Sequence, residues 1–404
     1  MTYYSNPFRP GAGHQPPYLA GREHEKNEFL RLIQQDVILD NLVLTGLRGV
    51  GKTVLLDKLK PLAIDAKWLW VGTDLSESAS LSEERIALRL LTDIAVVTAN
   101  IEIDRREQFG MGFTTDAKTV SETLDYAVLK QWFDDTPGLT QDKLRHVLDA
   151  VWYYVKTTGI KGIIFAYDEA QNLSDQVKKE EYPLALLLDS FQSIQKRNIP
   201  MMLLLTGLPT LFPKLVESRT FAERMFSVLF LQKLDDEQSR LAILKPIEDQ
   251  QSALSLHPDS VDTIVRLSGG YPYFIQFMCR EVYDVFIQKI DRREKPVVPV
   301  DEIVRKLDVD FFAGRWTRTT GRQRTLLSTI AQLPHCDEEF SVQDIVEQSK
   351  ETLTKPFSAS HISQMLSTLA DSGLIYKNRH GRYAFAVPLI AQFIQRQAVE
   401  NWDD

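Results

Sequence analysis

Short apolar runs alternate with helical patterns in the first half of the chain. Four runs have the length and unbroken hydrophobicity of buried parallel strands. They are residues 41–45, 67–71, 161–167 and 200–205. Apolar positions with a helical period predict helices between these runs, at 26–33, 82–97 and 141–157. The alternation predicts an α/β fold with a parallel sheet.

The second half of the chain changes to helical patterns. The apolar period is helical from 235 to about 307, and Pro246 is expected to end the first helix of this region. Three more helices and then two strands are predicted after it. They are residues 320–333, 341–348 and 358–370, followed by 374–377 and 382–387. Three helices and a hairpin are the element order of a winged helix.

The composition narrows the class of protein. The chain has 404 residues, 44% of them hydrophobic, which is enough for two or three packed domains. It opens without a secretion signal pattern, and no apolar run approaches about 18 residues, so we expect a cytoplasmic protein without membrane contact. Cys279 and Cys336 offer no disulfide pattern, and neither cysteines nor histidines have the spacing of a zinc site.

A glycine-rich turn between the first apolar run and a helical pattern predicts a nucleoside triphosphate site. Its glycines let backbone N–H groups converge on phosphate oxygens, Lys52 reaches the β- and γ-phosphates, and the Thr53 hydroxyl holds Mg²⁺. The N-terminus of the helix that begins here also attracts negative charge. The helical run extends up to Pro61. The residues expected at the nucleotide are Gly46, Gly49, Val50, Gly51, Lys52, Thr53 and Val54.

A pair of carboxylates follows the third apolar run. Asp168 and Glu169 come directly after 161–167, where open α/β sheets bind their ligands. We expect Asp168 to hold Mg²⁺ through water and Glu169 to polarise the attacking water as the general base. The fourth run ends in Thr206. If this strand lies beside the other two, its hydroxyl lies near the γ-phosphate; otherwise Thr206 is an ordinary turn residue.

These motifs resemble the AAA+ ATPases, within the branch shared by Orc/Cdc6-like, archaeal-type and STAND proteins. The resemblance makes 46–53 the Walker A motif, Asp168 and Glu169 the Walker B pair, and Thr206 sensor 1. It implies that Gly21 and Arg22 belong to an adenine-side motif. An arginine finger is expected at Arg224, with Arg219 as the nearby alternative and a surface ion pair as the ordinary role of either.

The resemblance also divides the chain into domains. It implies an ATPase core at 21–234 with a possible insertion at 101–138. The proline and glycine content of residues 1–20 predicts an extended arm that can pack across a neighbouring subunit. A helical lid is expected at 235–309 and a winged-helix domain at 310–404. The aromatic and glycine residues 109–113 of the insertion suit contact with nucleic acid or a partner, or else the tip of a flexible hairpin.

One departure from the family pattern bears on the rate of hydrolysis. Where a sensor 2 arginine is expected, the chain has Tyr273 and Phe274. A Gly-x-Pro element that ends at Pro272 resembles the STAND branch instead, in which that proline lies against the nucleotide. The resemblance therefore favours a slow switch over a motor.

The winged helix suggests duplex DNA as a partner. Its third helix would present polar side chains to a major groove, and basic side chains on its wing would neutralise phosphates. The residues are Ser360, His361, Gln364, Lys377, Arg379 and Arg382. The charge is mixed, because the chain has a net charge of −8 and residues 337–339 of the same domain are acidic. Docking of a protein is the alternative.

Together these features predict an ATP-controlled switch with ATP and Mg²⁺ as cofactors. We expect it to hydrolyse ATP slowly, to form homo-oligomers in its ATP state and to engage duplex DNA, in replication, transposition or loader recruitment. The alternative is a STAND-like signalling ATPase, for example in antiphage defence. Its winged helix would dock an effector protein or hold a closed state.

Overall fold

The computed structural model describes residues 5–11, 13–35, 37–109, 116–251, 254–292, 297–379 and 381–400. The chain divides into two compact units. One unit contains residues 23–45 and 55–230, and we call it the sheet unit. The other, the helical unit, contains residues 1–22, the turn at 46–54, and 231–404. The glycine-rich turn thus groups with helices that follow it by almost two hundred residues.

A five-stranded parallel sheet forms the centre of the sheet unit. Its strand order is β2-β5-β6-β1-β7, and every strand pair is parallel. The strands are β1 (Asn41–Thr45), β2 (Trp68–Val71), β5 (Gly162–Tyr167), β6 (Met201–Gly207) and β7 (Phe226–Phe230). Strands β1, β5 and β6 are buried along their whole length, which explains their continuous apolar runs. The four strands predicted from those runs are confirmed.

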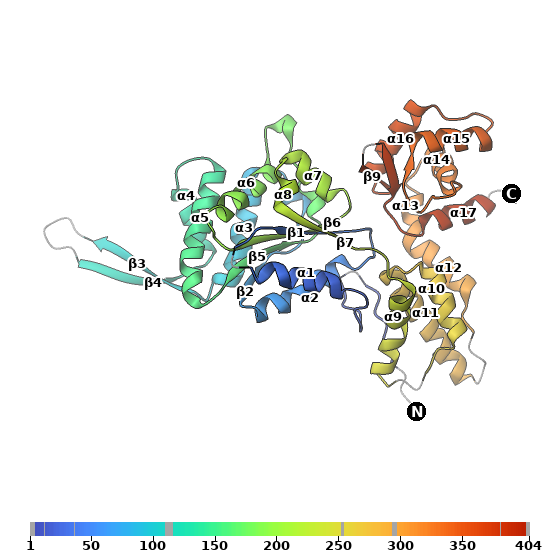
Figure 1. The fold of residues 1–404 in the computed structure, drawn as a ribbon, viewed down its shortest axis with the longest axis horizontal. Helices are drawn as coiled ribbons and strands as arrows, with labels where there is room; N and C mark the ends of the chain where they lie inside the picture. The colour runs from blue at the N-terminus through green and yellow to red at the C-terminus, as the bar shows by residue number, and fades with distance from the viewer. Residues whose placement is uncertain are drawn as a thin grey trace. The chain divides into compact units, whose positions relative to one another are not determined.

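Helices cover both faces of this sheet. Figure 1 shows α1 (Glu23–Ile33) and α2 (Lys52–Asp65) on one face and α3 (Glu83–Thr98) and α6 (Pro183–Gln195) on the other. Helices α3, α6 and α5 (Thr140–Val155) bury their apolar stripes in one continuous core with the strands. Short helices α7 (Leu211–Ser218) and α8 (Ala222–Met225) precede β7. Such two-sided cover is the doubly wound arrangement that the alternating sequence pattern predicts.

The segment predicted as an insertion forms a hairpin and a helix. Strands β3 (Glu102–Phe109) and β4 (Asp116–Thr123) pair in antiparallel register, and α4 (Tyr126–Asp135) follows them. Leu129 and Phe133 of α4 are buried in the core of the sheet unit. Residues 110–115, which include most of the aromatic and glycine loop, lie outside the described residues.

The helical unit holds four helices followed by a smaller domain. The helices are α9 (Asp236–Asp249), α10 (Pro258–Ser268), α11 (Pro272–Asp291) and α12 (Val300–Leu307). A π-helical segment (Asp308–Ala313) and the short helix α13 (Gly314–Trp316) lead into the C-terminal domain. One hydrophobic core runs through the four helices and this domain.

The C-terminal domain contains the predicted helices and hairpin. They are α14 (Gly321–Ala331), α15 (Val342–Thr352), α16 (Ala359–Asp371), β9 (Ile375–Arg379) and β10 (Arg382–Phe385). Two elements were not predicted. A two-residue strand, β8 (Phe340–Ser341), pairs with β10, and α17 (Ile390–Glu400) packs against α14.

Two prolines do not end their helices. The sequence pattern ended helices at Pro61 and Pro246, yet α2 continues to Asp65 and α9 to Asp249. A proline inside a helix loses its own hydrogen bond and crowds the carbonyl group four residues before it. Burial of Pro246 and of the apolar side chains around it offsets this loss in α9.

The described part of the N-terminal arm, residues 5–11 and 13–20, contains no helix or strand and packs on its own chain. The Phe8 side chain is buried, and its ring centroid lies 6.1 Å from that of Tyr283. The Asn6 amide donates to the Arg280 carbonyl at 3.0 Å. In the described part of the chain, no helix combines the length and hydropathy needed to cross a membrane.

Candidate functional site

The glycine-rich turn has a backbone that only glycine adopts easily. Gly49 and Gly51 have φ angles of +79° and +92°, in the left-handed region. Gly46 is needed for a different reason, because an added Cβ atom would lie 2.6 Å from the Leu231 carbonyl oxygen. These constraints fix the backbone of the turn between β1 and α2.

Lys52 lies over the turn at the start of α2. Its Nζ donates to the carbonyl oxygens of Gly46 at 2.9 Å and Leu47 at 3.0 Å. The ammonium is therefore held above the same loop whose N–H groups would bind phosphate oxygens. Thr53 is partly exposed in the first turn of α2.

Arg22 is buried and braces the turn. Its side chain is 4% exposed, and Nη2 donates to the carbonyl oxygens of Val50 at 2.9 Å and Gln232 at 2.8 Å. The guanidinium thus joins the turn to the segment after β7. The sequence placed Arg22 in an adenine-side motif but did not indicate this bracing contact.

The N-terminus of α11 also contacts the turn. The Tyr273 N–H donates to the Gly49 carbonyl at 3.1 Å, and Pro272 occupies the first turn of the helix. Gly270 makes the approach possible. Its φ is +77°, and an added Cβ would lie 2.4 Å from the Leu234 carbonyl oxygen. The Gly-x-Pro element found in the sequence therefore lies against the glycine-rich turn.

In the sheet unit, the predicted carboxylates follow β5. Asp168 is 3% exposed, and its Oδ1 accepts a hydrogen bond from the Glu169 N–H at 2.8 Å. Glu169 is exposed and has a φ of +52°, which is uncommon for a residue other than glycine. Such strain is concentrated at functional sites. The Glu169 carboxylate accepts a hydrogen bond from the Gln171 amide.

Thr206 lies beside Asp168 on the adjacent strand. β6 is located between β5 and β1, and Tyr167 pairs with Leu205, so the next residues on both strands are neighbours. The strand that carries Thr206 therefore lies between the two strands that precede the glycine-rich turn and Asp168. Its hydroxyl is buried and has no hydrogen-bond partner among the described residues. Thr206 belongs to the strand itself rather than to the turn after it.

The two candidate finger arginines have different surroundings. The Arg219 guanidinium forms two hydrogen bonds to the Asp189 carboxylate, at 2.9 and 2.8 Å. That hydrogen bonding raises the pKa of Arg219. Arg224 is exposed in α8, directly before β7, and has no ion pair within the described residues. Only Arg224 is free to contact a second molecule.

The predicted DNA contacts are spread over α16 and the hairpin. Ser360, Gln364 and Lys377 are exposed, and His361 is half-buried. Arg382 is partly neutralised by Asp344, whose Oδ2 lies 3.4 Å from Nη1. The Arg379 side chain lies outside the described part of the structure. α16 itself carries no lysine or arginine.

Solved structures share the arrangement of strands and helices. The Walker-type ATPase PABY2304 of Pyrococcus abyssi is 16% identical with a TM-score of 0.57, over 96% of this chain and 98% of that chain. The ADP form of the Aeropyrum pernix ORC2 protein is 13% identical with a TM-score of 0.54, over 96% and 97%. The ADPNP-ADP complexes of ORC2 give 12% and 0.50, over 96% and 98%.

Comparison of the sequence with protein families matches only the C-terminal part of the chain. A family model described as "Domain of unknown function (DUF8462)" matches residues 309–394, which lie in the C-terminal domain and the π-helical segment before it. No curated protein matches the chain.

Proposed function

Because the chain has the fold of the Orc/Cdc6-type AAA+ ATPases, we propose that it is an ATP-binding switch that hydrolyses ATP slowly. The observation that carries the proposal is the phosphate loop, with left-handed glycines at 49 and 51 and the Lys52 ammonium above it. This arrangement matches the chemistry of a triphosphate, which needs convergent N–H donors and one mobile cation.

The residues Asp168 and Glu169 after β5, and Thr206 within β6, suit hydrolysis. Mg²⁺ would be held by the Thr53 hydroxyl and, through water, by the buried Asp168 carboxylate. When bound, the ion neutralises charge on the phosphates. The donor set fits this ion, because Mg²⁺ prefers oxygen ligands and keeps several waters. Glu169 would take the proton of the attacking water, and the orphaned Thr206 hydroxyl would orient that water.

The free guanidinium of Arg224 supports hydrolysis that depends on assembly. An arginine placed against the γ-phosphate neutralises transition-state charge. Since Asp189 already holds Arg219, we assign the finger to Arg224, acting on the nucleotide of a neighbouring copy. The protein would then form homo-oligomers in its ATP state.

The first test is nucleotide binding by calorimetry. Lys52→Ala should weaken ATP binding about a hundredfold or more, since it removes a charged hydrogen-bond donor to phosphate. Lys60→Ala removes an exposed lysine from the same helix and serves as the control. Equal affinities of the Lys52→Ala variant and the wild type for ATP would overturn the proposal.

We further propose that the C-terminal domain is a winged helix that engages duplex DNA through α16 and the hairpin. The element order and the exposure of Gln364 and Lys377 support this. The test is fluorescence anisotropy of a labelled duplex in ATP, in ADP and without nucleotide. Lys377→Ala should weaken binding and lower the salt dependence, whereas Lys350→Ala on α15 should not. Absence of binding in every state would remove DNA as the partner.

One observation favours the signalling alternative. Leu47 of the phosphate loop packs against an apolar cluster of the hairpin, formed by Tyr376, Ala384 and Ala386. A C-terminal domain seated on the phosphate loop suits a closed state that an effector protein or ligand would release. In that case Leu47→Ser should raise the rate of nucleotide exchange, and an unchanged rate would count against a closed state.

A further inference from the structure

The segment that enters the C-terminal domain is rich in arginine. Four arginines lie within ten residues, at 315, 318, 322 and 324. Arg324 is held inside the domain, because its guanidinium lies 5.4 Å from the Trp316 ring centroid and donates to the Trp316 carbonyl. Arg318 and Arg322 are exposed and have no ion pair in the described part of the chain. Arg315 is less exposed than Arg318 and Arg322.

Arg315 is half-buried and held in place by Phe311. Nη1 donates to the Phe311 carbonyl at 2.6 Å, and the guanidinium lies 5.0 Å from the centre of the Phe311 ring. Burial first, and then the charges of Arg48 and Arg318, lower the pKa of Arg315. No carboxylate contributes to this shift.

Contacts connect Arg315 to the phosphate loop. The ring centroids of Phe311 and Tyr273 lie 5.4 Å apart, and the Tyr273 N–H donates to the Gly49 carbonyl. Arg48 precedes Gly49 in the loop. It is exposed and has no ion pair within the described residues. This series of contacts joins the loop that carries Arg48 to the segment that carries Arg315 and Arg318.

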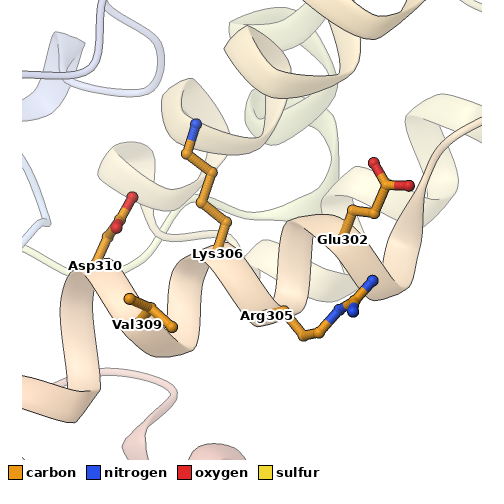
Figure 2. Close-up of a pocket in the computed structure, with 5 residues that line it drawn as sticks. All are labelled: Glu302, Arg305, Lys306, Val309 and Asp310. Atoms are coloured by element: carbon orange, nitrogen blue, oxygen red, sulfur yellow. The ribbon is translucent and has the colours of Figure 1, made fainter.

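A second group of basic residues in the helical unit lies beside carboxylates. Figure 2 shows an open hollow of about 370 Å³ on α12 and the π-helical segment. It is lined by Glu302, Arg305, Lys306, Val309 and Asp310, so its two cations are matched by two carboxylates. Lys306 also pairs with Glu281 at 2.7 Å. Among the described residues, no ion pair with a carboxylate is found for Arg48, Arg315 or Arg318.

We propose that Arg48, Arg315 and Arg318 form a phosphate-binding cluster beside the phosphate loop. Guanidinium groups bind phosphate with paired hydrogen bonds, and a bound dianion removes the repulsion between like charges. Two sources offer this group: the terminal phosphate of a nucleotide and a backbone phosphate of duplex DNA. The nucleotide source rests on the function proposed above.

Binding measurements distinguish the two sources. Dissociation constants for ATP and ADP, and for a labelled duplex over a range of salt, are measured for Arg315→Gln and Arg48→Gln. Arg322→Gln removes an equal charge from the same segment outside the cluster and is the control. If the nucleotide is the source, ATP affinity falls about ten- to hundredfold while ADP affinity changes little.

If DNA is the source, nucleotide affinities stay unchanged. Duplex affinity then falls more than in Arg322→Gln, and the salt slope decreases by about one. Variants that match Arg322→Gln in both measurements would overturn the proposal.

Thermal unfolding gives a test that does not depend on nucleotide binding. Without ligand, Arg48→Gln should raise the unfolding midpoint, because it relieves repulsion; a lower midpoint would contradict the proposal. Lys52→Ala serves as the background for a titration with pyrophosphate. The midpoint should rise with pyrophosphate there, and adding Arg315→Gln should abolish the rise. A wild type that binds no ATP would remove the proposed function, yet this titration would still decide on the cluster.

Discussion

Arg22 illustrates how one buried residue sets the geometry of a loop. Burial of a guanidinium is costly unless its donors are satisfied. Here the carbonyl oxygens of Val50 and Gln232 accept hydrogen bonds from the guanidinium. The guanidinium thus holds the backbone of the glycine-rich turn against the segment after β7.

We predict that Arg22→Ala lowers the free energy of unfolding by about 1–3 kcal/mol, since it leaves buried carbonyls unpaired. ATP affinity should fall with it, because Val50 is part of the loop. Urea unfolding and calorimetry measure the two effects. Arg31→Ala, which removes an exposed arginine of α1, is the control. A stable variant with weakened ATP binding would point to direct contact between Arg22 and the nucleotide.

A second residue-scale prediction separates the two finger candidates. Arg224→Ala should lower ATP turnover by about 10³-fold or more, because a finger neutralises transition-state charge. It should not lower the unfolding midpoint, because the Arg224 side chain has no ion pair among the described residues. Arg219→Ala should lower the midpoint, because it breaks the pair with Asp189. The measurements are phosphate release and thermal unfolding. A reversal of the two patterns would make Arg219 the finger.

The carboxyl group of Asp93 should make the free energy of unfolding depend on pH. Burial raises its pKa above the ordinary value of 3.8, although hydrogen bonds from Arg89 and Tyr167 oppose the shift. Between 3.8 and the raised pKa, the folded state binds more protons than the unfolded state. The contribution of this carboxyl to stability is therefore complete below 3.8 and is lost as pH rises through the raised pKa.

Asp93→Asn tests this sign, because the amide does not titrate. We expect the difference in unfolding free energy, wild type minus variant, to fall as pH rises from about 4 to 7. Urea unfolding at several pH values measures it. A difference that grows with pH would mean that Arg89 lowers the pKa by more than burial raises it.

At the scale of elements, α11 links the phosphate loop to the C-terminal domain. Its first turn donates to Gly49, and Tyr273 and Phe274 pack on Phe311 at centroid distances of 5.4 and 4.9 Å. The neighbouring Phe312 ring stacks on Phe393 of α17 at 5.3 Å. The π-helical segment contributes both phenylalanines. A movement of the loop would therefore reach α17 through one chain of aromatic contacts.

Gly270 gives the element-scale prediction. Gly270→Ala should lower the free energy of unfolding by at least about 1–2 kcal/mol, since its left-handed φ is costly for alanine and the added methyl group would meet the Leu234 carbonyl. It should also weaken ATP binding by shifting the start of α11.

Gly314→Ala is the matched control. Its φ is −62° and the added Cβ meets nothing within 4 Å, so this variant should gain about 0.4–1 kcal/mol. Urea unfolding compares the two variants. Equal stabilities would show that the turn before α11 adjusts without cost.

At the scale of the whole molecule, hydrolysis depends on assembly if Arg224 acts on a neighbouring copy. Glu169→Gln should bind ATP without hydrolysing it, and Arg224→Ala should do the same for a different reason. A mixture of the two variants would contain interfaces with an intact Glu169 and an intact Arg224. We expect such mixtures to recover part of the turnover, measured as phosphate release against mixing ratio. Turnover that remains at the sum of the two separate activities would place the finger in cis or remove it.

Local sequence determined the elements that depend on local patterns. β1, β5 and β6 follow from continuous apolar runs, because strands buried on both faces tolerate few polar residues. The phosphate loop follows from its glycines, since backbone conformation at these positions is a property of the residue itself. The order of helices and hairpin in the C-terminal domain follows from periodicity and capping residues such as Ser341.

Local rules failed where packing outweighed them. Pro246 lies inside α9 because burial of the surrounding side chains offsets one lost hydrogen bond. α17 and the two-residue β8 depend on partners far away in sequence, namely α14 and β10. The sequence pattern around these two elements has no clear period, so it predicts neither of them.

Only the tertiary structure decided which residues meet. The order of β5, β6 and β1 placed Thr206 beside Asp168. The ion pair between Arg219 and Asp189 distinguished Arg219 from Arg224 as a candidate finger. Contacts to the phosphate loop, such as that of Tyr273, come from residues more than two hundred positions away. The sequence by itself determined the chemistry of each motif, because that chemistry is carried by adjacent residues. Their partners were decided by long-range packing, which no local pattern encodes.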